Sequence, residues 1–325
     1  MAAPPTTFSV SGKTAIVTGA GSGINLCFAS LLLSRNCNVL IADLSLRPEA
    51  QKLVDEHSAK DADKPRAVFV KTDVTKWPDL QNMFDAAYAE FSGFDIVCPG
   101  AGVYEPPWSN FWHPPGSSLS RDPPAGEEGA GGLGHYALLD INVTHPIRVT
   151  QLAIAEFLSP REGSKMGGPV SVTNPKRIVL ISSIAGQVAG LVAPLYHASK
   201  WAISGFIRSL DSLDAALGIR VNGVAPGLIK TPLWTEAPEK LKYVDESRDA
   251  WATPEEVADA MLACVEDERY KGGTVLEVGH NQTRVVGMLN DPGPSGEGHM
   301  VSHMQKGIDE VFEWLKEDGW GKGGK

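Results

Sequence analysis

The sequence predicts an α/β fold: a doubly wound parallel sheet of about seven strands with helices on both faces. Two observations support this class. Short apolar runs alternate with helical patterns between residues 13 and 278. The first apolar run also leads directly into a glycine-rich turn that opens a helix. Because parallel strands need right-handed crossover connections, this alternation places the strands in one sheet between two layers of helices.

The expected elements follow one another in the order that such a fold needs. Strands are expected at residues 13–18, 38–42, 67–70, 94–97, 177–181, 219–224 and 273–278. Helices are expected at residues 26–35, 78–91, 136–158, 194–217 and 254–267. The last helix begins after Thr253 and has Glu256 at the capping-box position.

One of these helices contains a proline. Pro146 lies four residues after Asn142 in the helix at 136–158. Proline has no N–H group, so the carbonyl of Asn142 loses its intrahelical partner and a kink is expected there. The freed carbonyl offers a place for a water molecule. A kink that serves packing alone is the other interpretation.

The segment at about 103–135 interrupts the alternation. It is rich in Pro and Gly and is longer than an ordinary connection. It starts beyond the carboxyl end of a strand, where ligands bind in such sheets. Trp108, Phe111 and Trp112 therefore either face an apolar ligand or anchor a surface loop. Residues 230–248 are polar and irregular, which suits a lid over a substrate.

Composition excludes several classes of partner. The chain of 325 residues has a net charge of −10 and no basic block, so neither nucleic acid nor an anionic membrane is expected. No apolar run approaches the roughly 20 residues that a membrane span needs, and the start has no signal-peptide pattern. A cytoplasmic location is expected. Cysteines and histidines show no metal-ligand spacing, so no metal is expected.

The glycine-rich turn at residues 18–25 has the context of a dinucleotide-binding turn. Its glycines let the backbone approach a pyrophosphate, and the following helix offers free N–H groups. A tight turn needs glycine too, so this feature alone leaves both interpretations open. Asp43 lies 20 residues after Gly23, at the end of the second strand. A carboxylate there accepts hydrogen bonds from ribose hydroxyls and repels a 2′-phosphate. With Ser22 in place of a basic residue, this favours NAD over NADP, although Asp43 as a helix cap is the alternative.

Tyr196 and Lys200 lie four residues apart, on one face of a helix. A free phenol has a pKa of about 10, and a nearby ammonium group lowers it. The pair therefore predicts a proton donor or acceptor that works near neutral pH. Two residues that meet on an exposed helix are the alternative. Ser183, after the fifth strand, and Asn142 argue for the catalytic interpretation.

Taken together, these residues resemble the short-chain dehydrogenase/reductase family over roughly residues 10–280. The matching motifs are Thr18-Gly19-x3-Gly23, Asp43, Asp73-Val74, Ala101-Gly102, Asn142, Ser182-Ser183, Tyr196-x3-Lys200 and Pro226-Gly227-x3-Thr231. Within the family, the Ser-Ser-x-Ala-Gly and Pro-x-Tyr-x-Ala-Ser-Lys segments are similar to those of hydroxyprostaglandin-dehydrogenase-like members. Polyketide-pathway alcohol dehydrogenases of the hydroxyaverantin type are an equal possibility.

The resemblance implies a role for each matching residue. Tyr196 would be the general acid/base, Lys200 would lower its pKa and bind the nicotinamide ribose, Ser183 would hold the substrate oxygen, and Asn142 would place a water. Besides Tyr196 and Lys200, the implied cofactor contacts are Gly19, Ser22, Gly23, Ile24, Asp43, Asp73, Val74, Ala101, Gly102, Pro226, Gly227, Ile229 and Thr231.

The resemblance also implies a function and an assembly. Residues 1–289 would be a single NAD-binding catalytic domain of Rossmann type, and residues 290–325 an extension with one amphipathic helix at 301–316. The enzyme would move a hydride between a secondary alcohol or ketone, such as a lipid-like or polyketide-type substrate, and nicotinamide. A homodimer or homotetramer is implied. A non-catalytic cofactor-binding regulatory or scaffold protein is the alternative, against which the four intact catalytic positions argue.

Two departures from the family pattern concern the cofactor site. Asn25 stands where the family has its third glycine, and Pro99-Gly100 stands where the family has two asparagines. We expect Asn25 to crowd the cofactor or alter the packing of helix against strand. The loss of two amides at residues 99–100 removes groups that brace the sheet.

Overall fold

Eight strands form one sheet in the computed structural model, which describes residues 7–60, 64–124, 134–236, 245, 249–288, 304–317 and 320. The strand order is β3-β2-β1-β4-β5-β6-β7-β8, and all neighbours are parallel except β7 and β8. The strands are β1 (Thr14–Thr18), β2 (Asn38–Asp43), β3 (Ala67–Lys71), β4 (Ile96–Cys98), β5 (Lys176–Ile181), β6 (Ile219–Pro226), β7 (Val275–Gly279) and β8 (Gln282–Val285). The order runs outward from β1 in one direction and from β4 in the other, which is the doubly wound topology.

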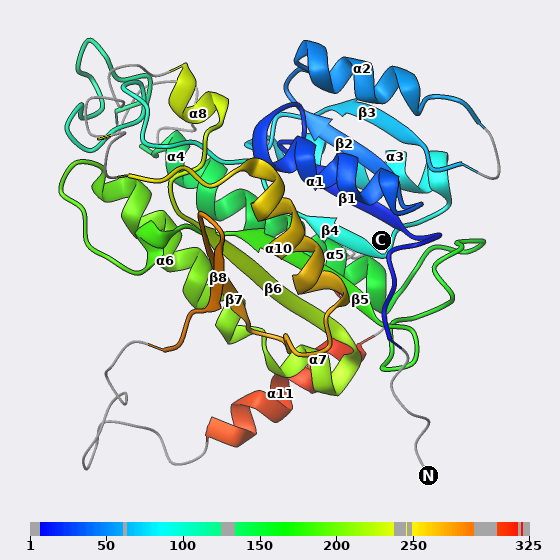
Figure 1. Ribbon diagram of the computed structural model, residues 1–325. Coiled ribbons are helices and arrows are strands. Elements are labelled where there is room, and N and C mark those ends of the chain that lie inside the picture. Colours follow the sequence, from blue (N-terminus) through cyan, green and yellow to red (C-terminus); the bar gives the residue numbers. More distant parts are fainter. Residues whose placement is uncertain are drawn as a thin grey trace.

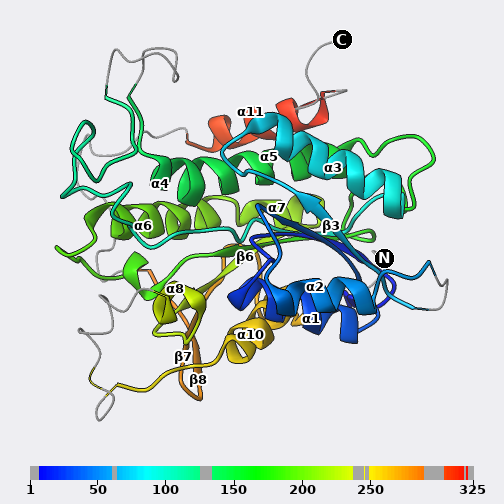
Figure 2. The same cartoon turned by 90° about the horizontal axis from the view of Figure 1, so that it is seen from above.

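Helices cover both faces of this sheet (Figures 1 and 2). Helices α1 (Gly23–Ser34) and α10 (Pro254–Glu266) pack together on one face. On the other face lie α3 (Trp77–Phe91), α5 (His145–Leu158) and α6 (Pro194–Ser209). The central strands are buried on both sides: in β1, Ala15 and Val17 join one apolar cluster and Ile16 joins the other. The predicted fold class is therefore confirmed.

The sheet has one strand more than expected. Strand β8 pairs antiparallel with β7 at the sheet edge, and its four residues are all exposed. Its sequence, Gln-Thr-Arg-Val, has no apolar run, which explains why the sequence does not predict it. Helix α2 (Pro48–Glu56) is also an addition. The capping box of Thr253 and Glu256 is present at the start of α10, as predicted.

The helix expected at 136–158 is interrupted by a π-helical turn. It consists of α4 (Ala137–Leu139), a π-helical turn at Asp140–Thr144 and α5. The amide of His145 donates to the carbonyl of Asp140, five residues back. Because Pro146 cannot donate to Asn142, the backbone widens here, as π-turns do at interruptions of the helical ladder.

The helix expected at 194–217 is two helices, α6 and α7 (Ser212–Leu217). The hydroxyl of Ser209 donates to the carbonyl of Gly205 at 2.9 Å. Such back-bonding slightly destabilises helices, and the backbone after Ser209 changes to bonds three residues back, from Leu210 to Ile207 and from Asp211 to Arg208. Gly218, with φ of 79°, ends α7 in the left-handed conformation.

The C-terminal helix α11 (Met304–Lys316) confirms the expected helix over most of its length. Its Leu315 is buried, and Leu315 and Phe312 belong to the apolar cluster that contains α3 and α5. Figure 2 shows α11 beside these helices. Residues 290–303, at the start of the expected extension, lie outside the described residues. Among the helices described, none is both long and apolar enough to cross a membrane.

Candidate active site

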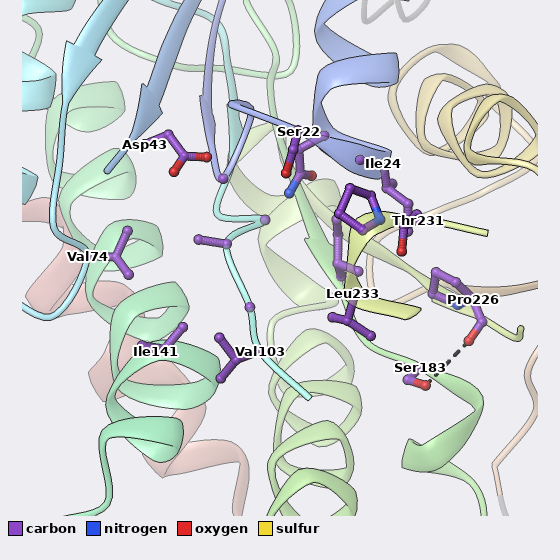
Figure 3. Close-up of a pocket in the computed structure, with 18 of the residues that line it drawn as sticks. Ser22, Ile24, Asp43, Val74, Val103, Ile141, Ser183, Pro226, Thr231 and Leu233 are labelled. Carbon is purple, nitrogen blue, oxygen red and sulfur yellow. Dashed lines mark hydrogen bonds between the residues drawn. The ribbon is translucent and has the colours of Figure 1, made fainter. Parts of the chain in front are cut away.

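A cavity of about 360 Å³ opens at the carboxyl ends of the strands, between β1 and β4, where the strand order reverses (Figure 3). It brings together all the residues predicted for the site except Asn142. These are Gly19, Ser22, Gly23, Ile24, Asp43, Asp73, Val74, Ala101, Gly102, Ser183, Tyr196, Lys200, Pro226, Gly227, Ile229 and Thr231. Asp43 and Val74 lie at one end of the view in Figure 3, and Ser183 and Pro226 lie at the other.

The glycine turn forms one wall of the cavity. Gly19 and Gly23 have φ of 72° and 60°, a conformation that glycine adopts without strain. A side chain at Gly21 would place its Cβ 2.3 Å from the carbonyl oxygen of Ser45. Helix α1 starts directly after this turn, and the Ser22 side chain does not cap its N-terminal amides. These amides are free to bind an anion.

Asp43 at the end of β2 closes the same end of the cavity. One carboxylate oxygen accepts a hydrogen bond from the amide of Gly21 at 2.8 Å, and the other accepts from the amide of Leu44 at 2.7 Å. The side chain is therefore fixed, and its remaining lone pairs can accept from a ligand. The guanidinium group of Arg47 turns instead to Glu236, with which it makes two hydrogen bonds.

The two departures from the family pattern contact each other. The Asn25 side chain is buried and packs over Gly100. A Cβ at position 100 would lie 2.3 Å from Asn25 Oδ1, and one at Gly19 would lie 3.0 Å from Asn25 Nδ2. The amide of Asn25 thus occupies the room that a side chain at residue 100 would need. It also lines the cavity, so an amide is present here although it comes from the helix.

A buried histidine joins the cofactor side to the helix that carries Asn142. Thr18 Oγ1 accepts from the amide of Ala101 at 3.1 Å and lies 3.1 Å from His145 Nε2, to which it donates because the proton of the neutral ring is on Nδ1. His145 Nδ1 then donates to the carbonyl of Ile141 at 3.1 Å. Burial lowers the pKa of His145 to about 4. The ring is therefore neutral near pH 7 and holds these segments in one arrangement.

Tyr196, Lys200 and Ser183 meet at the other end of the cavity. The ammonium nitrogen of Lys200 lies 5.5 Å from the centre of the Tyr196 ring and donates to the carbonyl of Ile181 at 2.9 Å. The Ser183 hydroxyl donates to the carbonyl of Pro226 at 3.3 Å and accepts from the amide of Ala185 at 3.1 Å. Helix α6 and the end of β5 thus direct one phenol, one ammonium and one hydroxyl into one space.

The acid–base properties differ from the expectation for Tyr196. Burial raises the pKa of Tyr196 to about 12, and a hydrogen bond with Ser183 only partly opposes this shift. Burial also lowers the pKa of Lys200 to about 8. Both shifts disfavour the charged form of the group, as removal from water does. In this structure the effect of burial on the phenol is larger than the effect of Lys200.

Asn142 lies behind the cavity wall. Its amide nitrogen donates to the carbonyl of Val103 at 2.8 Å and to Ser199 Oγ at 3.2 Å, and its side-chain oxygen accepts from the amide of Val103 at 2.9 Å. A Cβ at Gly102 would be 3.4 Å from that oxygen and 3.7 Å from Lys200 Nζ. Asn142 therefore fixes the backbone at Val103, where Gly102 leads into the insertion.

Aromatic residues other than the three expected ones lie near Tyr196. Phe111 and Trp112 are about half exposed, and neither they nor Trp108 line the cavity. Instead the Tyr104 ring packs 4.6 Å from the Tyr196 ring, and Trp234 lies 5.9 Å from Tyr104. Trp234 belongs to α8 (Pro232–Thr235), within the expected lid. The rest of that lid lies largely outside the described residues.

Sequence reasoning missed further cavity residues. They are Leu44, Thr72, Thr75, Val103, Ile141, Ile181, Pro232, Leu233 and Trp234. Asn25, Gly100 and Ser182, which the sequence analysis named for other reasons, also line the cavity. Most are neighbours of predicted residues and follow from the same elements. Trp234, three residues after Thr231, is the exception, because only the lid hypothesis gave a signal for it. In the part of the chain described, no three His, Cys, Asp or Glu side chains are placed to hold a metal ion.

Comparison with known proteins gives consistent results. The family described as short chain dehydrogenase matches residues 13–242. Cis-4-hydroxycyclohexanecarboxylate dehydrogenase of Sinomonas cyclohexanicum is 30% identical over 277 residues, which is 84% of this chain and 97% of the relative. A hydroxynaphthalene reductase-like protein of Metarhizium majus is 29% identical over 85% of this chain and 97% of its own. L-fucose dehydrogenase of Bos taurus is 26% identical over 82% of this chain and 88% of its own.

Solved structures share the fold. A short-chain type dehydrogenase/reductase from Mycobacterium marinum aligns with a TM-score of 0.65 and 22% identity, over 84% of this chain and 96% of that one. The 3-ketoacyl-(acyl-carrier-protein) reductase from Brucella melitensis, solved with NADH, aligns with a TM-score of 0.63 and 22% identity over 83% and 98%. With the family match and the relative at 30% identity, these findings establish that the chain is a nucleotide-binding oxidoreductase of the short-chain dehydrogenase/reductase family.

Proposed function

We propose that this enzyme uses NAD to oxidise a secondary alcohol, or NADH to reduce the matching ketone, with Tyr196 as the general acid/base. The observation that carries the proposal is the meeting of Tyr196, Ser183 and Lys200 in one cavity with the glycine turn and Asp43. One part of the cavity, at the glycine turn and Asp43, suits a dinucleotide, and the part at Tyr196, Ser183 and Lys200 suits proton transfer. A protein that only bound the cofactor would not need the second place.

The residues of the cavity fit NAD. The uncapped amides at the start of α1 suit a pyrophosphate, and the close approach of the backbone at Gly21 leaves no room for a side chain. Asp43 can accept from the adenosine ribose hydroxyls and would repel the 2′-phosphate of NADP. The proposal therefore includes a preference for NAD. Asp73, Val74, Ile229 and Thr231 would complete the contacts along the cofactor.

The chemical step needs a hydride acceptor, which bound nicotinamide supplies, and a proton acceptor, which the chain supplies. As the alcohol loses a hydride from carbon, its hydroxyl proton passes to the Tyr196 phenolate. The Ser183 hydroxyl, whose proton goes to the Pro226 carbonyl in this structure, would turn and donate that proton to the substrate oxygen, which keeps the oxygen near the phenol. Lys200 uses one of its three protons for the Ile181 carbonyl, which leaves donors for the ribose hydroxyls. Burial keeps Tyr196 protonated in the protein alone, and the positive charge of oxidised nicotinamide would favour the phenolate once the cofactor is bound. Because the phenolate is the active form in oxidation, that direction should become faster as pH rises.

We propose an uncharged, ring-bearing substrate of the polyketide or lipid-like type. Trp234 lines the cavity and lies beside the Tyr104 ring, which stands against Tyr196, and Val103, Ile141 and Leu233 add apolar surface to the cavity wall. Such a lining suits a flat apolar ring. The names of two relatives refer to hydroxylated rings, a cyclohexanecarboxylate and a naphthalene; the naphthalene ring is flat and apolar, whereas the cyclohexane compound agrees only in carrying a hydroxylated ring.

The test is a screen of cyclic secondary alcohols with NAD, followed by the absorbance of the reduced cofactor. Turnover of at least one hydroxylated ring compound, with open-chain alcohols of equal carbon number turned over more slowly, supports the proposal. NAD binding without turnover of any substrate in either direction would favour the non-catalytic regulatory or scaffold alternative. Faster turnover of the open-chain alcohols would overturn the proposed substrate class alone.

A further inference from the structure

Three consecutive residues at the start of the insertion contact the catalytic residues. Val103 holds the Asn142 side chain through two backbone hydrogen bonds. The Tyr104 ring packs against the Tyr196 ring at 4.6 Å. Glu105 then accepts a hydrogen bond from the backbone amide of Tyr196 at 2.8 Å. The first residues of the insertion thus lie beside the start of helix α6, which carries Tyr196.

The Glu105 side chain makes the most direct of these contacts with the backbone of helix α6. It is only 5% exposed, and both carboxylate oxygens accept from backbone amides. Oε2 accepts from Tyr196, and Oε1 accepts from Phe111 at 3.0 Å. The Asn110 side chain donates to the Glu105 carbonyl at 3.2 Å. A buried carboxylate is retained only with such partners, so Glu105 links the turn at 110–113 to helix α6.

The start of helix α6 needs this acceptor. The helix begins at Pro194, and its N-cap residue, Ala193, has no side chain that can accept a hydrogen bond. Tyr196 is the third residue of the helix, so its amide is one of the first four, which have no partner within the helix. A carboxylate is favoured at this positive end of the helix dipole. Glu105, 91 residues earlier in the chain, takes the part that a capping Ser or Asp normally takes.

We propose that Glu105 is a positioning residue, which fixes the first turn of α6 and thereby the place of the Tyr196 hydroxyl relative to Ser183. This inference rests on the proposed role of Tyr196. The phenol projects from a helix end, and helix ends fray when their amides lack acceptors. A displacement of about 1 Å at a reacting group costs on the order of 10²-fold in rate. The insertion therefore contributes to turnover through a hydrogen bond to the backbone of the catalytic tyrosine.

The insertion offers a matched control. Asp122 is also buried, at 3% exposure, and its Oδ1 accepts from the amide of Ala137 at 2.9 Å, at the first residue of α4. Its Oδ2 accepts from Ser109 Oγ at 2.8 Å. Asp122 thus caps a helix from the same segment, and its carboxylate is bonded to Ala137 and Ser109 rather than to Tyr196. Loss of either carboxylate weakens the insertion, but only loss of Glu105 frees the Tyr196 amide.

The experiment compares Glu105→Ala, Glu105→Gln and Asp122→Asn. Hydrogen–deuterium exchange, measured by mass spectrometry on protein without cofactor, reads out the first turn of α6 directly, since Pro194 has no amide and Tyr196 contributes one of the first signals. We expect Glu105→Ala to accelerate exchange there by roughly tenfold or more, because an amide that loses its hydrogen-bond acceptor loses protection. Glu105→Gln retains one carbonyl oxygen and should accelerate it less. Asp122→Asn should leave this turn unchanged.

Kinetics completes the test. We expect Glu105→Ala to lower kcat by about 10- to 100-fold with little change in NAD affinity, and Glu105→Gln to recover part of this loss. An unchanged exchange rate at the first turn of α6 in Glu105→Ala overturns the inference. So does an equal fall of kcat in Asp122→Asn, which would indicate general destabilisation of the insertion. If Tyr196→Phe keeps full turnover, the proposed function fails, whereas the exchange result still reports on the cap.

Discussion

The packing of Asn25 over Gly100 leads to a quantitative prediction about residue 100. In Gly100→Ala, the new Cβ would lie 2.3 Å from Asn25 Oδ1 and 2.7 Å from its Cγ and Nδ2. Carbon atoms normally stay about 3.5–4.0 Å apart. All three atoms of the amide are too close, so rotation of the amide about its own bond does not relieve the clash. Gly19 confines the amide from the other side. Overpacking of this kind costs about 1–3 kcal/mol of unfolding free energy.

The assay is a double-mutant cycle with Asn25→Gly, measured by urea unfolding. Alone, Asn25→Gly should cost roughly 0.3 kcal/mol in helix propensity, because asparagine is itself a poor helix former, in addition to the lost packing of the buried amide. In that background, Gly100→Ala has room for its methyl group, so its cost should largely vanish. The two changes should couple by about 0.5–3 kcal/mol.

Gly205→Ala in helix α6 serves as the control, since a Cβ there meets nothing within 4 Å. It should stabilise the protein by up to about 1 kcal/mol. An equal cost of Gly100→Ala in both backgrounds would refute the reasoning, because Asn25 would then not be the obstacle.

Three further predictions follow from the site. Asp43→Ala should narrow the difference between the NAD and NADP dissociation constants, measured by fluorescence titration; an unchanged difference would contradict the role of this carboxylate. Without cofactor, the tyrosine absorbance of the wild type minus that of Tyr196→Phe should show no phenolate up to pH about 10, since burial raises the pKa of Tyr196 to about 12; phenolate below pH 9 would show that Lys200 dominates. Light scattering at micromolar protein should give the mass of a dimer or tetramer, and a monomer mass would refute the homodimer or homotetramer that the family resemblance implies.

The sequence predicts the central fold because each buried strand is a short apolar run with clear ends. Strand β2 is buried almost throughout, and its four inner residues, Val39 to Ala42, are all apolar, whereas β6 is buried throughout but also contains Arg220 and Asn222. Strand β8 carries no such signal, because it lies at the edge with all its side chains exposed. The sequence does not predict the division between α6 and α7 for another reason. The apolar periodicity continues across it, whereas the break is a local change of backbone hydrogen bonding at residues 210–213.

The sequence predicts a site residue where its type and spacing allow few other physical roles. Glycine at close backbone approaches and a tyrosine one helical turn before a lysine are of this kind. Tyr104 and Glu105 were not, because their roles depend on where an insertion without periodicity folds, and Trp234 was not, because it lies in the irregular segment at 230–248. The separate expectations for Asn25 and Gly100 missed a spatial relation: the two positions are far apart in sequence but occupy one space.

The measurement that tests the central claim most directly is the turnover of Tyr196→Phe at saturating NAD and substrate. The ring stays and the proton acceptor is lost, so kcat should fall by about 10²–10⁴-fold, as is usual when general acid/base catalysis is removed. The NAD dissociation constant, measured in parallel, should remain close to that of the wild type, because the hydroxyl acts on the substrate. Turnover within a few-fold of the wild type would contradict the account and leave the Tyr196–Lys200 pair a structural role.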